Sequence, residues 1–504
     1  MVRMEGKLFG KAKVTVKALT PLLVGGREPD RFVHLSSSAD ESRFIIPSSA
    51  IKGAIVERIK SVGASDFLDD LGEGEREGTV KFSEMKATSG GKNYDERTRV
   101  SINPKTRTAE AGHLFLLAAA PKGLKFVGDI LFKREISTEE YHRFTKLLTG
   151  FPIHIGGGQT SGFGRIQIEF GSLEKVPSHT LQKGLWQINL KPLSPYSSKP
   201  VSGRMEKSYF VPSKEVIESL AIKKVFGVQR SGWFFPSKAS PKQGFPVPFT
   251  FYKEKNSEDG HPIDLIKEFL YSRITGIPFL LANKATDSRL VPMKGYINLT
   301  GNREKIKVTP ITSYHIKRNL KTRTVEEFWV QVGYRPEYYS GIVRADDDSL
   351  EIPQLVQLGG SRGKGYGLFE VEKAESYKRW ETWGSTIKAC SEFIAGEIPN
   401  QSVHNGLWIP ILITSPTVPD SAFIRNYAIV HEFSKSCVVR KFVPETGKTH
   451  LVSAVSPGSV WLLLPKEQNS PLERVVENLK DLKNSGIGAY TEDGFGDFEI
   501  YPWG

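Results

Sequence analysis

The sequence is poor in cysteine and in long apolar runs. Only Cys390 and Cys437 occur among 504 residues, and two cysteines far from any histidine cluster cannot build a tetrahedral zinc site alone. They suit a reducing compartment, so we expect a cytoplasmic protein. No apolar stretch approaches the roughly 18 residues of a membrane helix. The first residues, MVRMEGKLFGKAKVTV, lack the apolar core of a secretory signal.

Familiar catalytic and nucleotide-binding motifs are also missing. The chain contains no GxxxxGK[ST] phosphate loop, no Ser-His-Asp elbow, no HExxH and no CxxC. Its glycine-rich segments follow a helix and precede a strand, which is the reverse of the Rossmann order. Binding of ATP or a dinucleotide is therefore disfavoured.

The composition is that of a globular protein with an excess of basic residues. Hydrophobic residues make up 39% and charged residues 25%, and the length predicts about three domains. Lys and Arg number 69 against 56 Asp and Glu, for a net charge of +13. This excess favours an anionic partner.

Periodicity and capping signals predict an α+β order in the first third of the chain. Apolar residues alternate over 11–18, and Ser48-Ser49 begins a helix with Ile51, Ala54, Ile55 and Ile59 on its inner face. A helix opening at Ser137 follows three further strands, and a strand ends the unit. The expected strands are 99–102, 114–119, 126–132 and 165–170. This order predicts a ferredoxin-like sandwich, with residues 63–91 as a mobile insertion.

Internal repetition is the most informative feature of the sequence. A glycine-rich segment occurs as IGGGQTSGFGRIQIEF at 155–170, LGGSRGKGYGLFEVEK at 358–373 and IGAYTEDGFGDFEI at 487–500. NPKTRTAE at 103–110 returns as NLKTRTVE at 319–326, and LTPLLVGG at Leu19 resembles LKPLSPYS at Leu190 and, more weakly, LITSPTVP at Leu412. We predict three related α+β units, at 1–176, 184–380 and 405–504.

The two KTRT elements concentrate positive charge without acidic residues. Each carries four basic side chains: Arg97, Arg99, Lys105 and Arg107 in the first, and Lys317, Arg318, Lys321 and Arg323 in the second. Such a stretch can follow a nucleic-acid backbone, and its threonines can add phosphate hydrogen bonds. The alternative is a solvated edge. The nearby Tyr314, Phe328 and Trp329 are as well suited to a core as to stacking on bases.

The glycine-rich segments can bring backbone N–H groups close to a phosphate. The candidates are Gly157, Gly158, Gly359 and Gly360, with Arg362 and Lys364 among the glycines of the second copy. The alternative is a tight connection between a helix and a strand. In the third copy Glu492, Asp493 and Asp497 make phosphate binding doubtful.

Four segments together resemble the RAMP superfamily of CRISPR effector subunits, in particular the backbone-type subunits of type III (Csm/Cmr) complexes. They read TPLLVGG, RFIIPSSAIKGAI, RVSINPKTRTAEAGHLF and GGGQTSGFGRIQI. The closing GIGAYTEDGFGDF resembles the last loop of the larger fused subunits of type III-D systems. The resemblance implies tandem ferredoxin-like (RRM-like) RAMP units that bind guide RNA, target RNA and other effector subunits. It also adds Lys52 to the RNA-binding candidates.

The resemblance further implies one cleaving aspartate ahead of the PxSSxKG segment. Asp30 falls at that place and Asp40 is the competing choice; either carboxylate could hold a divalent ion, with Mg²⁺ expected, for cutting target RNA. An aspartate after proline is equally common in a plain turn. Two alternatives stay open: a non-catalytic RNA-binding scaffold, and a metal-independent endoribonuclease that processes the guide. The histidines available for the latter are His34, His113, His154 and His315.

Overall fold

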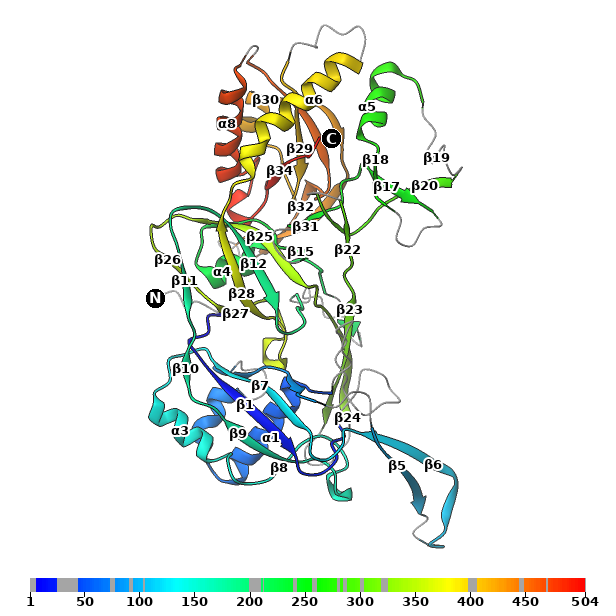
Figure 1. Ribbon diagram of the computed structural model, residues 1–504, viewed down its shortest axis with the longest axis vertical. Coiled ribbons are helices and arrows are strands. Elements are labelled where there is room, and N and C mark those ends of the chain that lie inside the picture. Colours follow the sequence, from blue (N-terminus) through cyan, green and yellow to red (C-terminus); the bar gives the residue numbers. More distant parts are fainter. Residues whose placement is uncertain are drawn as a thin grey trace.

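Three sheet-and-helix units follow one another along the chain and lie one above another in the computed structural model (Figure 1). Each predicted range supplies one of the larger sheets, while the exact boundaries stay predictions. Among the residues that the structure describes, no helix is long and apolar enough to cross a membrane. The structure describes residues 6–24, 44–72, 78–89, 94–102, 105–198, 210–211, 213–238, 243–255, 261–278, 282–283, 288–299, 303–318, 325–397, 406–443, 448–467 and 470–503.

The first unit is an eight-stranded sheet with helices on one face, as expected for a ferredoxin-like α+β unit. Its central strand β1 alternates between buried and exposed residues and pairs antiparallel with β7 and β9. The main path of the sheet is β2 (Ile45–Ile46), β4 (Met85–Ala87), β7 (Lys125–Phe132), β1 (Gly10–Ala18), β9 (Arg165–Phe170) and β8 (Ile153–His154). Two short strands join it at the side: β3 (Val80–Phe82) on β7 and β10 (Glu174–Lys175) on β1.

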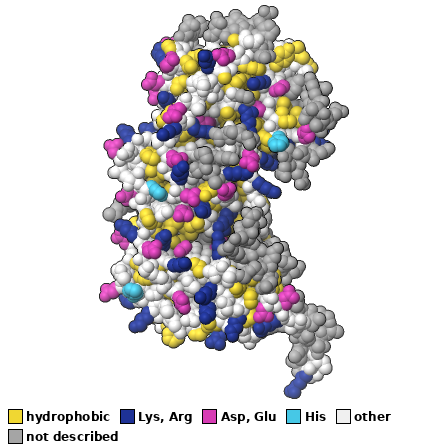
Figure 2. All heavy atoms as spheres, in the orientation of Figure 1, with side chains coloured by type: hydrophobic (Ala, Val, Ile, Leu, Met, Phe, Trp, Pro, Cys, Tyr) yellow, Lys and Arg dark blue, Asp and Glu magenta, His cyan; other side chains and the backbone are white. Residues whose placement is uncertain are grey.

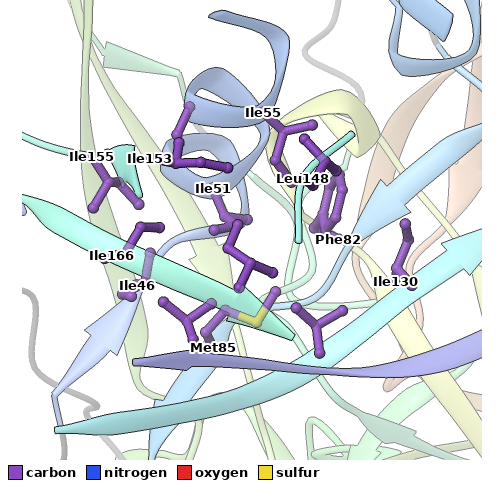
Figure 3. Close-up of a cluster of buried hydrophobic side chains, with 14 of the residues drawn as sticks. Ile46, Ile51, Ile55, Phe82, Met85, Ile130, Leu148, Ile153, Ile155 and Ile166 are labelled. Atoms are coloured by element: carbon purple, nitrogen blue, oxygen red, sulfur yellow. The ribbon is translucent and has the colours of Figure 1, made fainter. Parts of the chain in front are cut away.

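Two helices of the first unit bury their apolar stripes on this sheet. Helix α1 (Ser48–Ser61) buries the four apolar residues predicted for its inner face, and Figure 3 shows Ile51 and Ile55 above Met85 and Ile130. Helix α3 (Thr138–Lys146) begins as expected, because the Ser137 hydroxyl accepts a hydrogen bond from the Glu140 N–H. In α1 the N-cap is Pro47, which provides no side-chain hydrogen bond.

The prediction of a mobile insertion over residues 63–91 is wrong for the residues described there. They form η1 (Ser65–Phe67), α2 (Leu68–Leu71), β3 and β4, and the two strands pair with β7. Val80, Phe82, Met85 and Ala87 are buried in the core of the unit. The many charges of this segment concealed its few apolar positions.

The second unit repeats this plan around β12, which pairs antiparallel with β25 and β28. Helix α4 (Ser219–Phe226) packs on its sheet. The strands are β14 (Arg230–Ser231), β25 (Tyr338–Ala345), β12 (Gly184–Pro192), β28 (Leu368–Ser376) and β27 (Leu355–Gln357), with β15 (Phe235–Ser237) on β25. A separate pair joins β11 (Ser178–Leu181) to β26 (Leu350–Pro353).

Residues 243–306 form an insertion whose core packs with the third unit. Phe251 and Leu270 share an apolar cluster with Leu412 and Val460. The insertion contains α5 (Ile266–Thr275) and two small sheets, β16 (Gly244–Pro246) with β21 (Tyr296–Asn298) and β22 (Lys305–Ile306), and β18 (Ile263–Asp264) with β17 (Phe251–Glu254), β20 (Ser288–Pro292) and β19 (Ala282–Asn283).

The third unit has a four-stranded sheet with β29 at its centre. Its helices α6 and α8 bury Ile387, Val475 and Leu479 against the sheet strands. The strands are β30 (Tyr427–Phe433), β33 (Val460–Pro465), β29 (Ile409–Ile413) and β34 (Phe498–Ile500). The helices are η4 (Arg379–Thr382), α6 (Trp383–Glu397), α7 (Ser421–Asn426) and α8 (Leu472–Ser485).

Candidate nucleic-acid interface

Each unit carries one long β-hairpin, here called an arm, directly before the strand that pairs with its first strand. Arm 1 precedes β7, arm 2 precedes β25 and arm 3 precedes β33. The arms are β5 (Asp95–Ile102) with β6 (Ala109–Ala119), β23 (Pro310–Arg318) with β24 (Val325–Tyr334), and β31 (Ser436–Val443) with β32 (Lys448–Val455). Strand β13 (Phe210–Val211) adds to arm 2. In Figure 1 arm 1 projects away from the first unit, and arm 2 extends toward that unit.

The two KTRT elements occupy the tips of arms 1 and 2. Ile102 pairs with Ala109 and Arg318 pairs with Val325, so a six-residue loop closes each arm: NPKTRT at 103–108 and NLKTRT at 319–324. In both arms the register also shifts close to the tip, between Val100 and Ile102 and between Lys317 and Arg318. The sequence repeat thus stands at the same place in the strand pairing of both arms.

The described part of the first tip presents its positive charge to solvent. Lys105 and Arg107 are exposed, and Arg107 has a φ of 53°, a left-handed conformation that makes the chain turn back. The hydroxyls of Thr106 and Thr108 are hydrogen bonded at 2.8 Å. Such a turn holds cationic side chains outward, where a phosphate backbone can reach them.

Other residues of the basic elements are described only in part. Arg99 lies on β5, and Lys317 and Arg318 lie on β23, but the structure describes only their backbone. Lys321 and Arg323 lie outside the described residues. The side chains of Tyr314, Phe328 and Trp329 also lie outside them, so their stacking role stays a prediction.

The three glycine-rich segments form the same turn in all three units. We call residues 155–164, 358–367 and 487–496 loops 1, 2 and 3. Each contains a three-residue 3-10 helix flanked by left-handed residues at both ends. These helices are η2 (Gln159–Ser161), η3 (Arg362–Lys364) and η5 (Thr491–Asp493).

Equivalent hydrogen bonds hold each loop to the segment that follows the first strand of its unit. The N–H groups of Gly157, Gly360 and Ala489 donate to the carbonyls of Leu23, Ser197 and Val418 at 2.7, 2.7 and 2.8 Å. The N–H groups of Gly164, Gly367 and Gly496 donate to the carbonyls of Pro21, Pro195 and Pro416 at 2.9, 2.8 and 3.0 Å. The Gly157 and Gly360 donors are therefore already engaged within the chain. A role of Gly157, Gly158, Gly359 and Gly360 in RNA binding stays a prediction.

These bonds correct the alignment of the start motifs. Pro195, and not Pro192 of LKPLSPYS, is the counterpart of Pro21, and Pro416 is the counterpart in the third unit. The last glycine of each loop is required by close packing: a Cβ on Gly164, Gly367 or Gly496 would lie 2.3, 1.8 or 2.0 Å from the carbonyl oxygen that begins the loop. The last glycine of the Gly-aromatic-Gly pattern follows from this contact.

Each arm contacts the loop of its own unit. The Arg97 guanidinium of arm 1 lies over the Phe163 ring at 5.0 Å, and the Gln331 amide of arm 2 donates to the Ser361 hydroxyl at 2.6 Å. In arm 3 the Lys441 ammonium lies 3.6 Å from the Tyr490 ring centre and 3.2 Å from an Asp493 carboxylate oxygen. Arm and loop thus form one assembly in every unit.

Three of the predicted RNA-binding residues lie on two elements, α1 and η3, that are in contact at the junction of the first two units. Arg362 and Lys364 belong to η3, which lies against α1, and Lys52 lies one turn after the start of α1. Figure 2 shows Lys and Arg side chains along the hollowed side of the molecule. Sequence reasoning listed these residues separately, because the contact joins segments some 300 residues apart.

The predicted metal site falls on residues that the structure does not describe. Asp30, Asp40 and His34 lie outside the described residues. Within the described part of the chain no group of three or more His, Cys, Asp or Glu side chains could hold a metal ion. Of the other histidines, His154 is exposed on β8, and the side chains of His113 and His315 are not among those described.

Comparison with known proteins identifies the first unit. Residues 15–167 match the family model of the RAMP superfamily. Among curated proteins none matches the sequence. Solved structures similar to the chain include one from a type III-B Cmr-beta complex in the apo state, at 13% identity and a TM-score of 0.25, which covers 32% of this chain and 96% of its own.

Two further solved structures overlap a similar share of the chain. One comes from a type IV-B CRISPR complex, with 11% identity, a TM-score of 0.24 and coverage of 32% of this chain and 90% of its own. The other is Cmr4, with 12% identity, a TM-score of 0.22 and coverage of 32% and 99%. These scores are too low to add to the family match.

Proposed function

Since residues 15–167 are a RAMP superfamily unit, we propose that this chain is a guide-RNA-binding subunit of a cytoplasmic type III CRISPR effector complex. The observation that carries the proposal is the pair of matching six-residue tips, NPKTRT and NLKTRT, each closing a long arm of its unit. Fusion of several such units resembles the large subunits of type III-D systems.

The chemistry of the tips fits the phosphate backbone of RNA better than its bases. Lys105 and Arg107 are exposed cations on one turn, with two threonine hydroxyls between and beside them. Contacts of this kind release condensed counterions, so binding weakens steeply as salt rises and depends little on sequence. Two such arms on consecutive units would hold one strand at two places.

Replacing Lys105 and Arg107 by Glu should weaken the binding of all guide sequences alike and lower the salt dependence of the affinity. Each lost phosphate contact removes about 0.7 from the slope of log K against log salt for a single strand. Fluorescence anisotropy with two unrelated guides at several salt concentrations measures both effects. The matched control replaces Lys122 and Lys125 by Glu. Both lysines are exposed and lie in the same unit outside the arm. Equal losses of affinity in both variants would show that the tip contributes only its positive charge.

We propose further that Asp30 supports metal-dependent cutting of target RNA. Asp30→Ala should abolish one cleavage product of the assembled complex and leave guide binding intact, because a carboxylate is the ligand a hard divalent ion prefers. Gel analysis of labelled target with Mg²⁺, with and without EDTA, measures this, and Asp40→Ala is the control. Loss of the product in Asp40→Ala alone would move the assignment to Asp40.

Two outcomes would favour the alternatives. If neither substitution changes the products, the chain is a non-catalytic scaffold. If the chain cuts precursor guide RNA in the presence of EDTA, it is a metal-independent processing nuclease of the same superfamily.

A further inference from the structure

A cavity lies where the second unit, the insertion at 243–306 and the base of arm 3 meet. Its volume is about 380 Å³, at the small end of the roughly 300–1,000 Å³ that is usual for sites of small ligands. Figure 1 shows β15, β31 and β32 at this junction. Side chains of all three parts line the cavity: Trp233 and Phe235 from the second unit, Phe249 and Tyr296 from the insertion, and Lys435 and Pro457 from the base of arm 3.

The aromatic rings of the cavity leave one of their number without a stacking partner. Phe235 and Tyr296 pack on each other, with ring centres 6.0 Å apart, and the Lys435 ammonium lies 4.4 Å from the centre of the Phe249 ring. Trp233 is half-buried and makes no ring contact with another side chain that the structure describes. Its indole therefore offers a flat face on which a planar group can stack.

The rim of the cavity is cationic. Lys294 and Lys435 both line it, and both are exposed. Within the described part of the chain, neither ammonium is paired with a carboxylate. Two unpaired ammonium groups beside a stacking surface can bind a phosphate that is attached to the stacked group.

A carboxylate, that of Glu215, also lines the cavity. It lies beside Tyr296, and burial together with this carboxylate raises the pKa of Tyr296, so the hydroxyl remains a proton donor. A carboxylate has more lone pairs than one hydroxyl can use. It can therefore also accept a hydrogen bond from the exocyclic amino group of a cytosine, adenine or guanine base, whereas uracil has no such group.

We propose that this cavity binds one nucleotide whose base carries an exocyclic amino group, either as a free nucleotide or as one unit of a bound RNA strand. The base stacks on Trp233 and donates from its amino group to Glu215. The phosphate binds Lys294 and Lys435. Tyr334, the last residue of β24, lies near the same carboxylate, so the cavity stands between the bases of arms 2 and 3. The proposal does not depend on guide binding by the tips of arms 1 and 2.

A proline-rich peptide is another ligand that aromatic side chains commonly hold. Such a peptide lies in an open groove and extends by about 3.1 Å per residue, whereas the cavity here has the size of a site for one small molecule. The exposed ammonium groups of Lys294 and Lys435 would also find no opposite charge on a proline-rich segment. The observations therefore favour a nucleotide, and peptide binding is an outcome of the test.

The test measures the binding of CMP, AMP and UMP to the full chain by equilibrium dialysis, after nuclease and high salt have removed nucleic acid. Trp233→Leu removes the stacking face, and Glu215→Gln removes the charge of the carboxylate. Lys294→Glu changes an exposed side chain, so it tests the phosphate contact without disturbing the core. Trp186→Leu is the matched control, because Trp186 is a half-buried tryptophan of the same unit that does not line the cavity.

We expect CMP and AMP to bind about fivefold more tightly than UMP, and Glu215→Gln to remove this preference. Trp233→Leu and Lys294→Glu should each lower the affinity for CMP about tenfold, while Trp186→Leu leaves it unchanged. The proposal is overturned if no nucleotide binds saturably, or if Lys294→Glu binds CMP like the wild type. It is also overturned if a proline-rich peptide, and not CMP, binds in a way that Trp233→Leu abolishes.

Two further measurements distinguish the source of the nucleotide. If the cavity holds a base of a bound strand, a short cytosine-containing RNA competes with CMP, and Trp233→Leu weakens the binding of that RNA. If the cavity holds a free nucleotide, the RNA does not compete. Both results support the proposal. Replacing Lys105 and Arg107 by Glu should leave CMP binding unchanged, so a failure of the proposed guide binding and a failure of the nucleotide site are separate results.

Discussion

At the scale of single residues, the third unit contains a buried cluster of charged side chains, and we expect its stability to depend on each of them. The Lys483 ammonium lies 2.8 Å from an Asp497 carboxylate oxygen and 3.8 Å from one of Glu499. Thr414 donates to Asp497 at 2.9 Å, and Tyr377 donates to Glu499 at 2.5 Å. Burial alone would raise the pKa of Asp497, but Lys483 and Arg230, together with the hydrogen bonds to the carboxylate, hold it below its usual value.

Replacing Lys483 by Met should lower the free energy of unfolding of the third unit by about 3 to 5 kcal/mol, because it removes the ammonium that is hydrogen bonded to the buried Asp497 and lies beside the buried Glu499. Lys466→Met, at an exposed position, should have little effect. Urea unfolding followed by tryptophan fluorescence compares the two. Because the pKa of Asp497 is lowered, its share of the stability is present above the usual pKa of 3.8 and is lost as the pH falls through the native value. The difference between wild type and variant should therefore shrink in acid; a constant difference would contradict the charge pairing.

At the scale of elements, the sequence specified some parts of the fold better than others. Helix α1 was predicted with its buried residues, because Ile51, Ala54, Ile55 and Ile59 recur at helical spacing. The three loops were found because the left-handed turns require glycine at fixed positions. The contact of α1 with loop 2 was missed, since neither segment signals the other in sequence.

Arm 3 was also missed, although it stands where arms 1 and 2 stand. Its turn reads PETG at 444–447 and lacks the basic KTRT pattern. The sequence does contain a signal that predicts this hairpin: runs rich in β-branched residues stand on either side of a segment with Pro and Gly. Its exposed Val438 and Leu451, 67% and 69% accessible, also break the usual alternation.

The joint between arm 3 and loop 3 depends on Lys441. Lys441→Glu should release the arm, because it replaces a cation beside Tyr490, Glu492 and Asp493 with a third carboxylate. Hydrogen–deuterium exchange should show lower protection across β31 and β32, while β29 and β33 keep theirs. Lys435→Glu, at the base of the same arm and over the Phe249 ring, serves as the comparison. Equal protection in wild type and Lys441→Glu would show that the arm holds without this contact.

At the scale of the whole molecule, loops 2 and 3 connect successive units, because each packs against the start of the first helix of the unit before it. Ser219→Leu should force loop 3 off α4, because the Cβ position of Gly494 already lies 2.1 Å from the serine. We expect a larger radius of gyration in small-angle scattering and faster proteolysis between the second and third units. Ser421→Leu is the control, since this serine begins the equivalent helix α7 and is exposed. A Ser219 variant as compact as the control would mean that the other contacts between these units, such as those of Arg230 and Arg344 with the carbonyls of Lys483 and Asn484, are sufficient.

The short helix α7 distinguishes the third unit from the two units before it. In stacked repeat proteins the terminal repeat differs from the others and stops further addition. Here loops 2 and 3 each cover the helix start of the unit before them, so the stack of three units has a direction. The last unit of this stack differs from the other two in such a way, because its helix α7 has 6 residues, against 14 in α1 and 8 in α4.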